Sequence, residues 1–248
     1  MRSGPHHGIV AMVRSLAEVL VIALCLLTFL IQPFRIPSAS MQPTLNVGDF
    51  LLVDKRAYTD EGRLGHLILP ASAAHRGDLA VFLFPPDPSR HLVKRIIGLP
   101  GDRIHLRDGR VLLNGQPITE TYAVYAPSRA DLFRDDFPNL TEADPDVDEH
   151  WWMTLRQSIV NGDIVVPANS FFVLGDNRNN SEDSRYWGFV PQANMVGRPL
   201  VVYFSTSWQR GQTADALPVD PTPIPEGSTL HRLGKALHDG FKAARILR

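Results

Sequence analysis

Ser40 and Lys94 are two residues whose chemistry can be combined to attack a carbonyl group. A serine hydroxyl is a weak nucleophile until a base removes its proton. A lysine amine can be that base if its surroundings keep it neutral. The sequences around them are Ile36-Pro37-Ser38-Ala39-Ser40-Met41-Gln42-Pro43-Thr44 and His91-Leu92-Val93-Lys94-Arg95-Ile96-Ile97-Gly98. The pair predicts hydrolysis by a serine and a lysine, provided that folding brings them together and buries the amine.

The apolar run around Lys94 predicts a β-strand, in which side chains alternate between two faces. Lys94 then shares a face with Leu92 and Ile96, and burial of that face would lower the pKa of the amine. A pKa of about 7 instead of about 10.4 corresponds to roughly 4 kcal/mol. Arg95 would point to the other face, where its positive charge would act on Lys94 in the same direction. The alternative is an amphipathic strand with an exposed lysine.

A Ser-His-Asp triad is the other source of a base, since the chain has nine histidines. His91 is the nearest sensible candidate. No G-x-S-x-G turn surrounds Ser40, and each histidine is interpreted as a surface or strand residue. The backbone N–H of Ser40 and the hydroxyl of Ser38 are the candidate donors to an oxyanion.

A polar segment, residues 175–188, holds too many small polar residues for an ordinary strand. It predicts a long hydrogen-bonded turn. Asp183 and Arg185 can pair to hold the shape of this turn. Ser181 can then deliver its hydroxyl to a buried amine, so a structural and a functional role are compatible.

An apolar segment, Leu16 to Ile31, precedes these motifs, and its sixteen residues are fewer than the roughly 20 that span a bilayer. A cleaved signal peptide would need small residues in an A-x-A pattern after it, and none follows. A buried core helix would be unusual at this place. The segment therefore predicts an uncleaved membrane anchor over residues 15–32. Arg2 and Arg14 favour a cytoplasmic N-terminus, residues 1–14.

From Asp49 onward the pattern is mostly β, with short apolar or β-branched runs bounded by turn residues. Asp108-Gly109 is a strong hairpin turn between two of these runs. Many short strands with regular glycine, proline and asparagine between them predict an antiparallel barrel or sandwich. The predicted strands are 50–53, 79–84, 92–97, 103–106, 110–113, 164–166, 171–174 and 200–204.

Residues 125–160 differ from this pattern. Eight acidic residues and one arginine lie between Asp131 and Glu149, and Trp151-Trp152 follow. We interpret the segment as a partly solvated insertion between two strands. A partner-binding lobe is the alternative that the paired tryptophans suggest.

The last part of the chain, residues 209–248, is interpreted as a proline-rich linker, densest over 215–226, followed by a C-terminal tail. Residues 231–248 can form a basic helix that contacts a membrane surface. Gly234 and Gly240 weaken that prediction, and a frayed tail is the alternative.

Composition argues against other classes of function. The formal net charge of −1, without a basic patch, gives no support for nucleic acid as a partner. Cys25 is the only cysteine, so no intramolecular disulfide can form. Because no Cys-x-x-Cys and no His/Cys cluster of zinc spacing is present, we expect neither a metal nor a cofactor.

Taken together, these motifs resemble the bacterial type I signal peptidases, the membrane-bound leader peptidases of the Ser/Lys dyad class. The similarity covers about residues 15–205, and the order of the motifs also agrees. Ala39 stands where many relatives carry glycine, a mild departure that narrows backbone freedom. The matching blocks are Pro37-Ser38-Ala39-Ser40-Met41 with Pro43-Thr44-Leu45, Val93-Lys94-Arg95-Ile96-Ile97-Gly98-Leu99-Pro100-Gly101-Asp102, and Gly175-Asp176-Asn177 through Gly188 with Gly197-Arg198.

The resemblance implies roles for individual residues. Ser40 would be the nucleophile and Lys94 the general base. Ser38 would supply the hydroxyl of the oxyanion hole. Three further residues would support the amine, one by orienting it and two as an ion pair: Ser181, Asp183 and Arg185.

The resemblance also implies a mainly β fold, with an antiparallel barrel-like catalytic core, an inserted second β region and one N-terminal transmembrane helix before them. The catalytic domain would span 33–208, with its insertion at about 125–160. The family removes signal peptides from exported preproteins, cutting after small residues at positions −1 and −3. The expected partners are exported preproteins and the lipid bilayer. The expected location is the cytoplasmic membrane, crossed once, with the catalytic domain on the outer side.

Two other classes of function are weighed against this one. A self-cleaving repressor with the same chemistry should carry a DNA-binding helix-turn-helix, whereas this chain has an apolar segment. An anchored β domain that only binds exported peptides is the non-enzymatic alternative. The presence of Ser40, Lys94 and Ser181 together argues against it.

Overall fold

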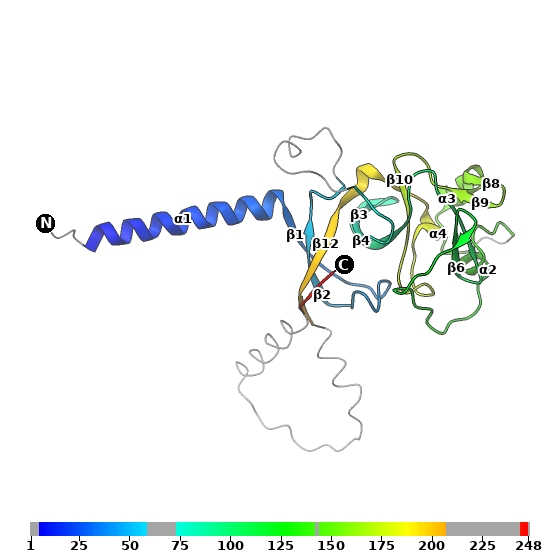
Figure 1. The fold of residues 1–248 in the computed structure, drawn as a ribbon, viewed down its shortest axis with the longest axis horizontal. Coiled ribbons are helices and arrows are strands. Elements are labelled where there is room, and N and C mark those ends of the chain that lie inside the picture. The colour runs from blue at the N-terminus through cyan, green and yellow to red at the C-terminus, as the bar shows by residue number, and fades with distance from the viewer. Residues whose placement is uncertain (1–4, 59–72, 142–143, 207–243, 248) are drawn as a thin grey trace, which may run out of the picture.

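The fold consists mainly of two antiparallel sheets (Figure 1). The structure is a computed structural model and describes residues 5–58, 73–141, 144–206 and 244–247. The strands of the larger sheet are β1 (Ile31–Arg35), β2 (Asp49–Asp54), β3 (Leu79–Phe84), β4 (Asp87–Gly98), β10 (Ser170–Leu174), β11 (Val190–Pro191), β12 (Met195–Ser205) and β13 (Arg245–Ile246). They lie in the order β1-β2-β12-β3-β4-β10-β11, with β13 paired to β12.

The larger sheet is open. All its pairings are antiparallel, as the sequence predicts. Within the described residues, β1 and β11 lie at opposite ends of the strand order and do not pair with each other. The expectation of a barrel is therefore wrong, because the described strands form an open sheet that does not close on itself. A physical reason is the length of β11, which has only two residues and cannot extend the ladder.

The second sheet has the order β7-β6-β5-β9-β8. Its strands are β5 (Arg103–Arg107), β6 (Arg110–Leu113), β7 (Gln116–Pro117), β8 (Ile159–Val160) and β9 (Asp163–Val165). Between β5 and β6, Asp108 and Gly109 have φ angles of 51° and 73°. Two positive φ angles are what a two-residue type I′ hairpin requires, so the predicted hairpin is confirmed.

The segment between β7 and β8 is mostly helical or irregular. It contains α2 (Leu132–Asp135), α3 (Glu149–Leu155) and the 3₁₀ helix η2 (Arg156–Ser158). Four of its large side chains are buried in the larger core cluster: Phe133, Phe137, Trp151 and Leu155. The indole N–H of Trp151 donates to the carbonyl of Arg185 at 3.0 Å. The segment therefore contributes to the core, and Trp151 has a structural role there.

The N-terminal apolar segment forms helix α1 (Pro5–Phe29), which extends away from the sheets (Figure 1). The chain does not continue as a helix to residue 32, because Ile31–Arg35 pair with β2. Among the described residues, no helix combines the length and the apolar character needed to cross a membrane. Large apolar side chains of α1 that are 54–69% exposed are Val10, Met12, Val13, Leu16, Val19, Leu20, Val21, Ile22 and Leu24.

The C-terminal predictions fall largely outside the described residues, which include neither the proline-rich linker at 215–226 nor residues 231–243. Within 244–247 the predicted helix is wrong, because Arg245 and Ile246 pair with β12 as strand β13.

Candidate active site

Lys94 lies on β4, which pairs with β3 on one side and β10 on the other. Its side chain points inward: Lys94 is 4% exposed, and Ile96 on the same strand face is fully buried. Of the two alternatives that the sequence left open, the structure therefore shows the inward-facing lysine and not an exposed one. Burial lowers the pKa of the Lys94 amine to about 8, with Asp183 acting against this shift and Arg185 adding to it.

Ser181 is the hydrogen-bond partner of Lys94. The Lys94 Nζ donates to the Ser181 Oγ at 3.0 Å, and both residues are buried. Ser181 lies in the turn between β10 and α4 (Ser184–Trp187). Gly175 allows this turn to pack closely, because a Cβ there would lie 2.2 Å from the Ser181 Oγ and 2.6 Å from the Ser40 carbonyl oxygen. The turn therefore brings a hydroxyl to the buried amine.

Asp183 and Arg185 form the buried ion pair that the sequence suggests. The guanidinium of Arg185 donates to both carboxylate oxygens of Asp183 at 2.8 Å. Asp183 also accepts from the Gly175 N–H at 3.0 Å, and Arg185 donates to the Arg178 carbonyl at 2.8 Å. Burial raises the pKa of Asp183, but the charge and hydrogen bonds of Arg185 outweigh it, so the pKa is lowered overall. The pair remains charged and holds the turn in shape.

Ser40 lies in a closed loop, which we call the Ser40 loop (residues 36–49). Its ends meet where the Ile36 N–H donates to the Asp49 carbonyl and the Gly48 N–H donates to the Ile36 carbonyl, each at 2.8 Å. Ser40 is 8% exposed. Its carbonyl accepts from the Asn177 N–H at 3.0 Å. The Ser40 loop is therefore bound directly to the turn that carries Ser181.

One cleft, with a volume of about 390 Å³, is lined by Ser38, Ser40, Lys94 and Ser181. The hydroxyls of Ser38 and Ser40 lie 3.3 Å apart. The cleft walls also include large apolar and aromatic side chains, namely Phe84, Leu92, Tyr186 and Trp187. Candidates from three separate segments of the chain, Ser38 with Ser40, Lys94 and Ser181, therefore line one cleft.

His91, the candidate base of a triad, does not line this cleft. Its ring instead packs against Phe34, with ring centroids 5.2 Å apart. The alternative of a Ser-His-Asp triad is therefore not supported by the position of His91.

Sequence reasoning missed a buried network around Asp176. Arg95 donates to both carboxylate oxygens of Asp176, at 2.7 and 2.6 Å, and the Thr44 hydroxyl donates to the same carboxylate. The Arg95 guanidinium also lies 3.9 Å from the ring centroid of Tyr122. The largest influences on the pKa of Lys94 are its burial and the charges of Asp183 and Arg185, whereas the charge of Arg95 is paired with Asp176. Arg95 fastens the Ser40 loop, through Asp176 and Thr44, to the larger sheet.

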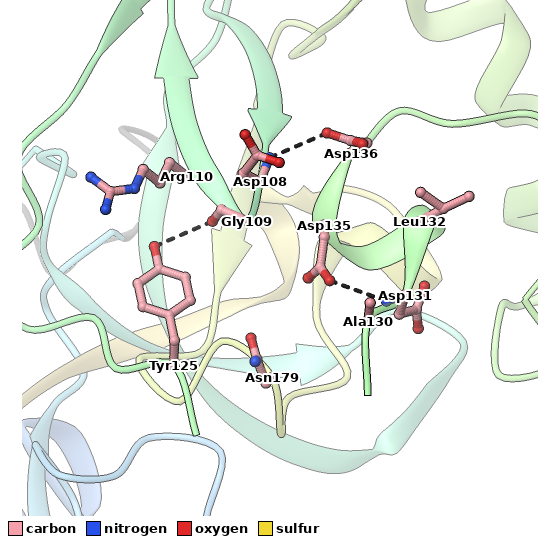
Figure 2. A pocket seen from close by; sticks show the side chains of 10 residues that line it. All are labelled: Asp108, Gly109, Arg110, Tyr125, Ala130, Asp131, Leu132, Asp135, Asp136 and Asn179. Carbon is pink, nitrogen blue, oxygen red and sulfur yellow. Dashed lines mark hydrogen bonds between the residues drawn. The ribbon is translucent and has the colours of Figure 1, made fainter. Parts of the chain in front are cut away.

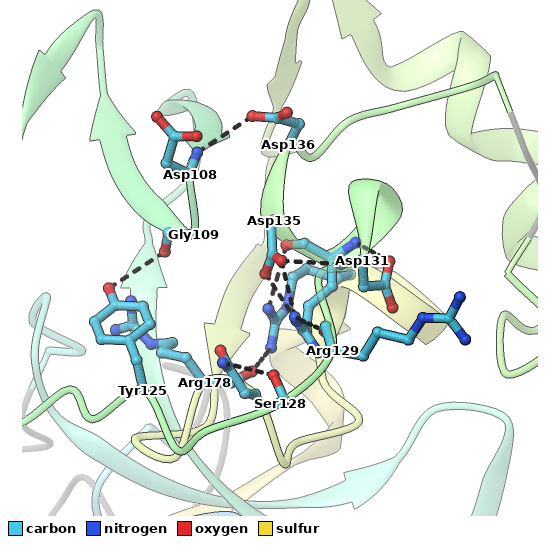
Figure 3. Close-up of polar contacts among 12 residues, drawn as sticks. Asp108, Gly109, Tyr125, Ser128, Arg129, Asp131, Asp135, Asp136 and Arg178 are labelled. Atoms are coloured by element: carbon cyan, nitrogen blue, oxygen red, sulfur yellow. Dashed lines mark hydrogen bonds and ion pairs between the residues drawn. The ribbon is translucent and has the colours of Figure 1, made fainter.

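A second pocket, of about 540 Å³, lies beside α2 (Figure 2). Asp108, Asp131, Asp135 and Asp136 line it, but three of these carboxylates already have partners. Asp131 caps α2, Asp135 pairs with Arg134 at 2.7 Å, and Asp136 accepts from the Asp108 N–H. Polar contacts in the same region are drawn in Figure 3. Among the described residues, no group of His, Cys, Asp or Glu is arranged to hold a metal ion.

Comparison with known proteins defines the class to which this fold and cleft belong, the serine endopeptidases. A family model described as "Signal peptidase, peptidase S26" matches residues 9–204. Signal peptidase I of Pseudomonas fluorescens is 36% identical over 207 residues, covering 77% of this chain and 71% of that protein. Signal peptidase I of Leptolyngbya laminosa is 37% identical over 199 residues, covering 77% and 78%. Signal peptidase I of Aquifex aeolicus is 31% identical over 246 residues, covering 85% and 90%.

The chain therefore belongs to the signal peptidase family, peptidase S26, and is a hydrolase of the serine endopeptidase class. A crystal structure of a signal peptidase I from Enterococcus faecalis is 32% identical, with a TM-score of 0.38, and covers 51% of this chain and 97% of that one.

Proposed function

We propose that this enzyme cleaves signal peptides from exported preproteins, with Ser40 as nucleophile and Lys94 as general base. The observation that carries the proposal is the Lys94 amine, which is buried, has a pKa of about 8 and donates to Ser181 in the cleft that Ser40 lines. A neutral amine that donates one N–H to a hydroxyl still has its lone pair free, so it can accept a proton. This is the property that a general base requires.

The proposed reaction has two halves. The Ser40 Oγ attacks the scissile carbonyl carbon while the Lys94 amine takes its proton. The backbone N–H of Ser40 and the hydroxyl of Ser38 stabilise the oxyanion. The Lys94 ammonium then gives its proton to the leaving amine, and an ester to Ser40 remains. In the second half Lys94 accepts a proton from water and the resulting hydroxide adds to the ester carbonyl. The Lys94 ammonium then gives this proton to the Ser40 oxygen as the acid departs, which restores the neutral amine.

The cleft supports a preference for small side chains at positions −1 and −3 of the substrate. Its volume of about 390 Å³ is shared with a peptide backbone. Large side chains, including Phe84, Tyr186 and Trp187, occupy its walls. An extended peptide can bind beside a strand, with alternate side chains entering the cleft.

Helix α1 supports a location at the membrane, and the basic residues Arg2 and Arg14 favour a catalytic part on the outer side. The large apolar side chains of α1 are 54–69% exposed at nine positions, and an exposed apolar surface of this extent marks a surface that a membrane or a partner covers. We expect the full chain to stay in the membrane fraction after alkaline carbonate washing. A chain that begins at Gln32 should be released by the wash, and equal retention of both would contradict an anchor in α1.

Cleavage of a purified preprotein by the full chain in detergent tests the chemistry. Ser40→Ala and Lys94→Met should each lower kcat by on the order of 10³-fold or more. Ser89→Ala is the matched control, because Ser89 is an exposed serine on the same strand as Lys94. Cleavage at the wild-type rate by either active-site variant would overturn the assignment of the pair.

A further inference from the structure

A C-terminal strand lies beyond the family match and returns to the catalytic part of the molecule. The match ends at residue 204, whereas β13 pairs with β12, with Arg245 opposite Val202 and Ile246 opposite Val201. The Leu247 N–H donates to the Leu200 carbonyl at 2.9 Å. In Figure 1 this stretch, in red, lies beside β12 and β2.

The two faces of this strand have different surroundings. Ile246 is 78% exposed. Leu247, on the other face, packs against the smaller core cluster, which contains Met41 and Leu45 of the Ser40 loop. Arg245 shares the face of Leu247, because side chains alternate along a strand. The strand therefore turns Arg245 toward the Ser40 loop.

Arg245 contacts the Ser40 loop at two points. Its Nη2 donates to the Thr44 carbonyl at 2.9 Å and to the Asp49 Oδ2 at 2.6 Å. The Asp49 carboxylate is fully buried and also accepts from the Asn46 N–H at 2.9 Å and from the Ser205 hydroxyl. Within the part of the chain that the structure describes, Arg245 is the cation paired with Asp49. A buried carboxylate is stable as a charge only when it is paired and hydrogen-bonded.

We propose that Arg245 is a positioning residue, through which the C-terminal strand holds the Ser40 loop in its reactive geometry. The inference rests on the proposed role of Ser40 as the nucleophile. The contacts of Arg245 with the loop are separate from those that Asn177 makes with Ser40 and that Asp176 makes with Thr44. Arg245 does not line the cleft. Its loss should therefore lower kcat and leave KM nearly unchanged.

Kinetics of the full chain in detergent provide the first test. Arg245→Ala should lower kcat by roughly 10- to 100-fold, because misplacement of a reacting group by about 1 Å has an effect of this size. KM should change by no more than about twofold, and Arg245→Lys should recover part of kcat. Because the side chain is 36% exposed, added guanidinium ion should reach the vacated site and raise kcat of Arg245→Ala.

Two variants on the same strand separate positioning from general stability. Ile246→Ser changes an exposed side chain and should keep the wild-type kcat. Leu247→Ala removes packing against the smaller core cluster without removing the charge, so guanidinium ion should not raise its kcat. Rescue of Leu247→Ala by guanidinium, or a wild-type kcat for Arg245→Ala, would overturn the proposal.

Amide hydrogen exchange tests the loop without reference to catalysis. The Leu45 N–H donates to the Met41 carbonyl at 2.9 Å, inside the Ser40 loop. Its protection should fall in Arg245→Ala, also when Ser40→Ala is present. Unchanged protection overturns the positioning role. Cleavage by Ser40→Ala would instead overturn the proposed function, while the exchange result would stand by itself.

Discussion

The Lys94 amine and the Ser181 hydroxyl lie 3.0 Å apart, although 87 positions separate them in the chain. Strand β4 buries the amine, and the turn after β10 supplies a hydroxyl that accepts a hydrogen bond from it. The candidate base therefore depends on two segments, strand β4 and the turn after β10, which are distant in the sequence and meet at this contact.

Activity should depend on pH through Lys94, whose pKa is about 8. Below this pH the amine is protonated and cannot accept the proton of Ser40. We expect kcat/KM to rise about tenfold per pH unit up to pH 8 and then to level off. The measurement is a profile of kcat/KM between pH 5.5 and 10 with a peptide substrate. A flat profile through pH 8 would contradict the assignment of the acid limb to Lys94. The same acid limb in the residual activity of Lys94→Met would also contradict it.

Lys94→Met should be inactive but more stable than the wild type at pH 7. Burial holds the pKa of Lys94 at about 8 in place of the ordinary 10.5, so the unfolded chain binds the proton more tightly. Wild-type stability therefore decreases as the pH falls from 10.5 to 8, by about 3 kcal/mol in all. Methionine avoids this loss but leaves Ser181 without a partner, which costs about 1 kcal/mol. Urea unfolding of the wild type and the variant at pH 7 and at pH 10.5 measures these differences in stability. A variant that is less stable than the wild type at pH 7 would contradict the proposed cost of burying Lys94.

Asp183 and Arg185 should shift the acid limb in opposite directions. The Asp183 charge raises the pKa of Lys94 and the Arg185 charge lowers it. In Asp183→Asn the acid limb of the remaining activity should move to lower pH, and in Arg185→Met to higher pH. Each variant also leaves a buried charge unpaired, so each should lose about 3–5 kcal/mol of stability. Shifts in the same direction would show that the two charges do not act on Lys94 in this way.

Gly175→Ala should strongly reduce cleavage even though the change is a single methyl group. The new Cβ would lie 2.2 Å from the Ser181 Oγ and 2.6 Å from the Ser40 carbonyl oxygen, so both must move. We expect kcat to fall by about 10²-fold or more, because both groups leave their reactive positions. Gly115→Ala is a control for the loss of a glycine, since a Cβ there meets nothing within 4 Å. Its positive φ of 80° makes a small loss of stability the expected result, without a change in kcat.

Glu120→Gln should affect stability more than a change at a surface ion pair. The Glu120 and Arg178 side chains are 5% and 1% exposed, and two hydrogen bonds of 2.7 and 2.6 Å join them. Loss of one charge should cost about 3–5 kcal/mol. Asp163→Asn breaks the more exposed pair with Arg103 and should cost at most about 1 kcal/mol. Equal midpoints of urea unfolding for the two variants would contradict the difference in burial.

Some parts of the fold were predictable because they depend on local patterns. The hairpin at Asp108-Gly109 needs two residues that tolerate positive φ, and the sequence places them between two apolar runs. Lys94 could be assigned to an apolar strand because the run around it is local, but its burial could not, since residues 94–98 of β4 are buried on both faces of the strand. Strand β1 was missed, since Ile31–Arg35 continue an apolar segment and their pairing with β2 is not local.

The candidate site divides in the same way. The chain by itself determined the reactive groups: a serine in a tight loop, a lysine in an apolar strand and a polar turn with Ser181. Only the tertiary structure decided which distant groups hold them, such as Asp176 on Arg95 and Arg245 on Asp49. The physical reason is that an ion pair depends on distance in space, and the sheet pairings that set these distances join segments far apart in the chain. Burial, which gives Lys94 its pKa of about 8, likewise exists only once those segments have packed.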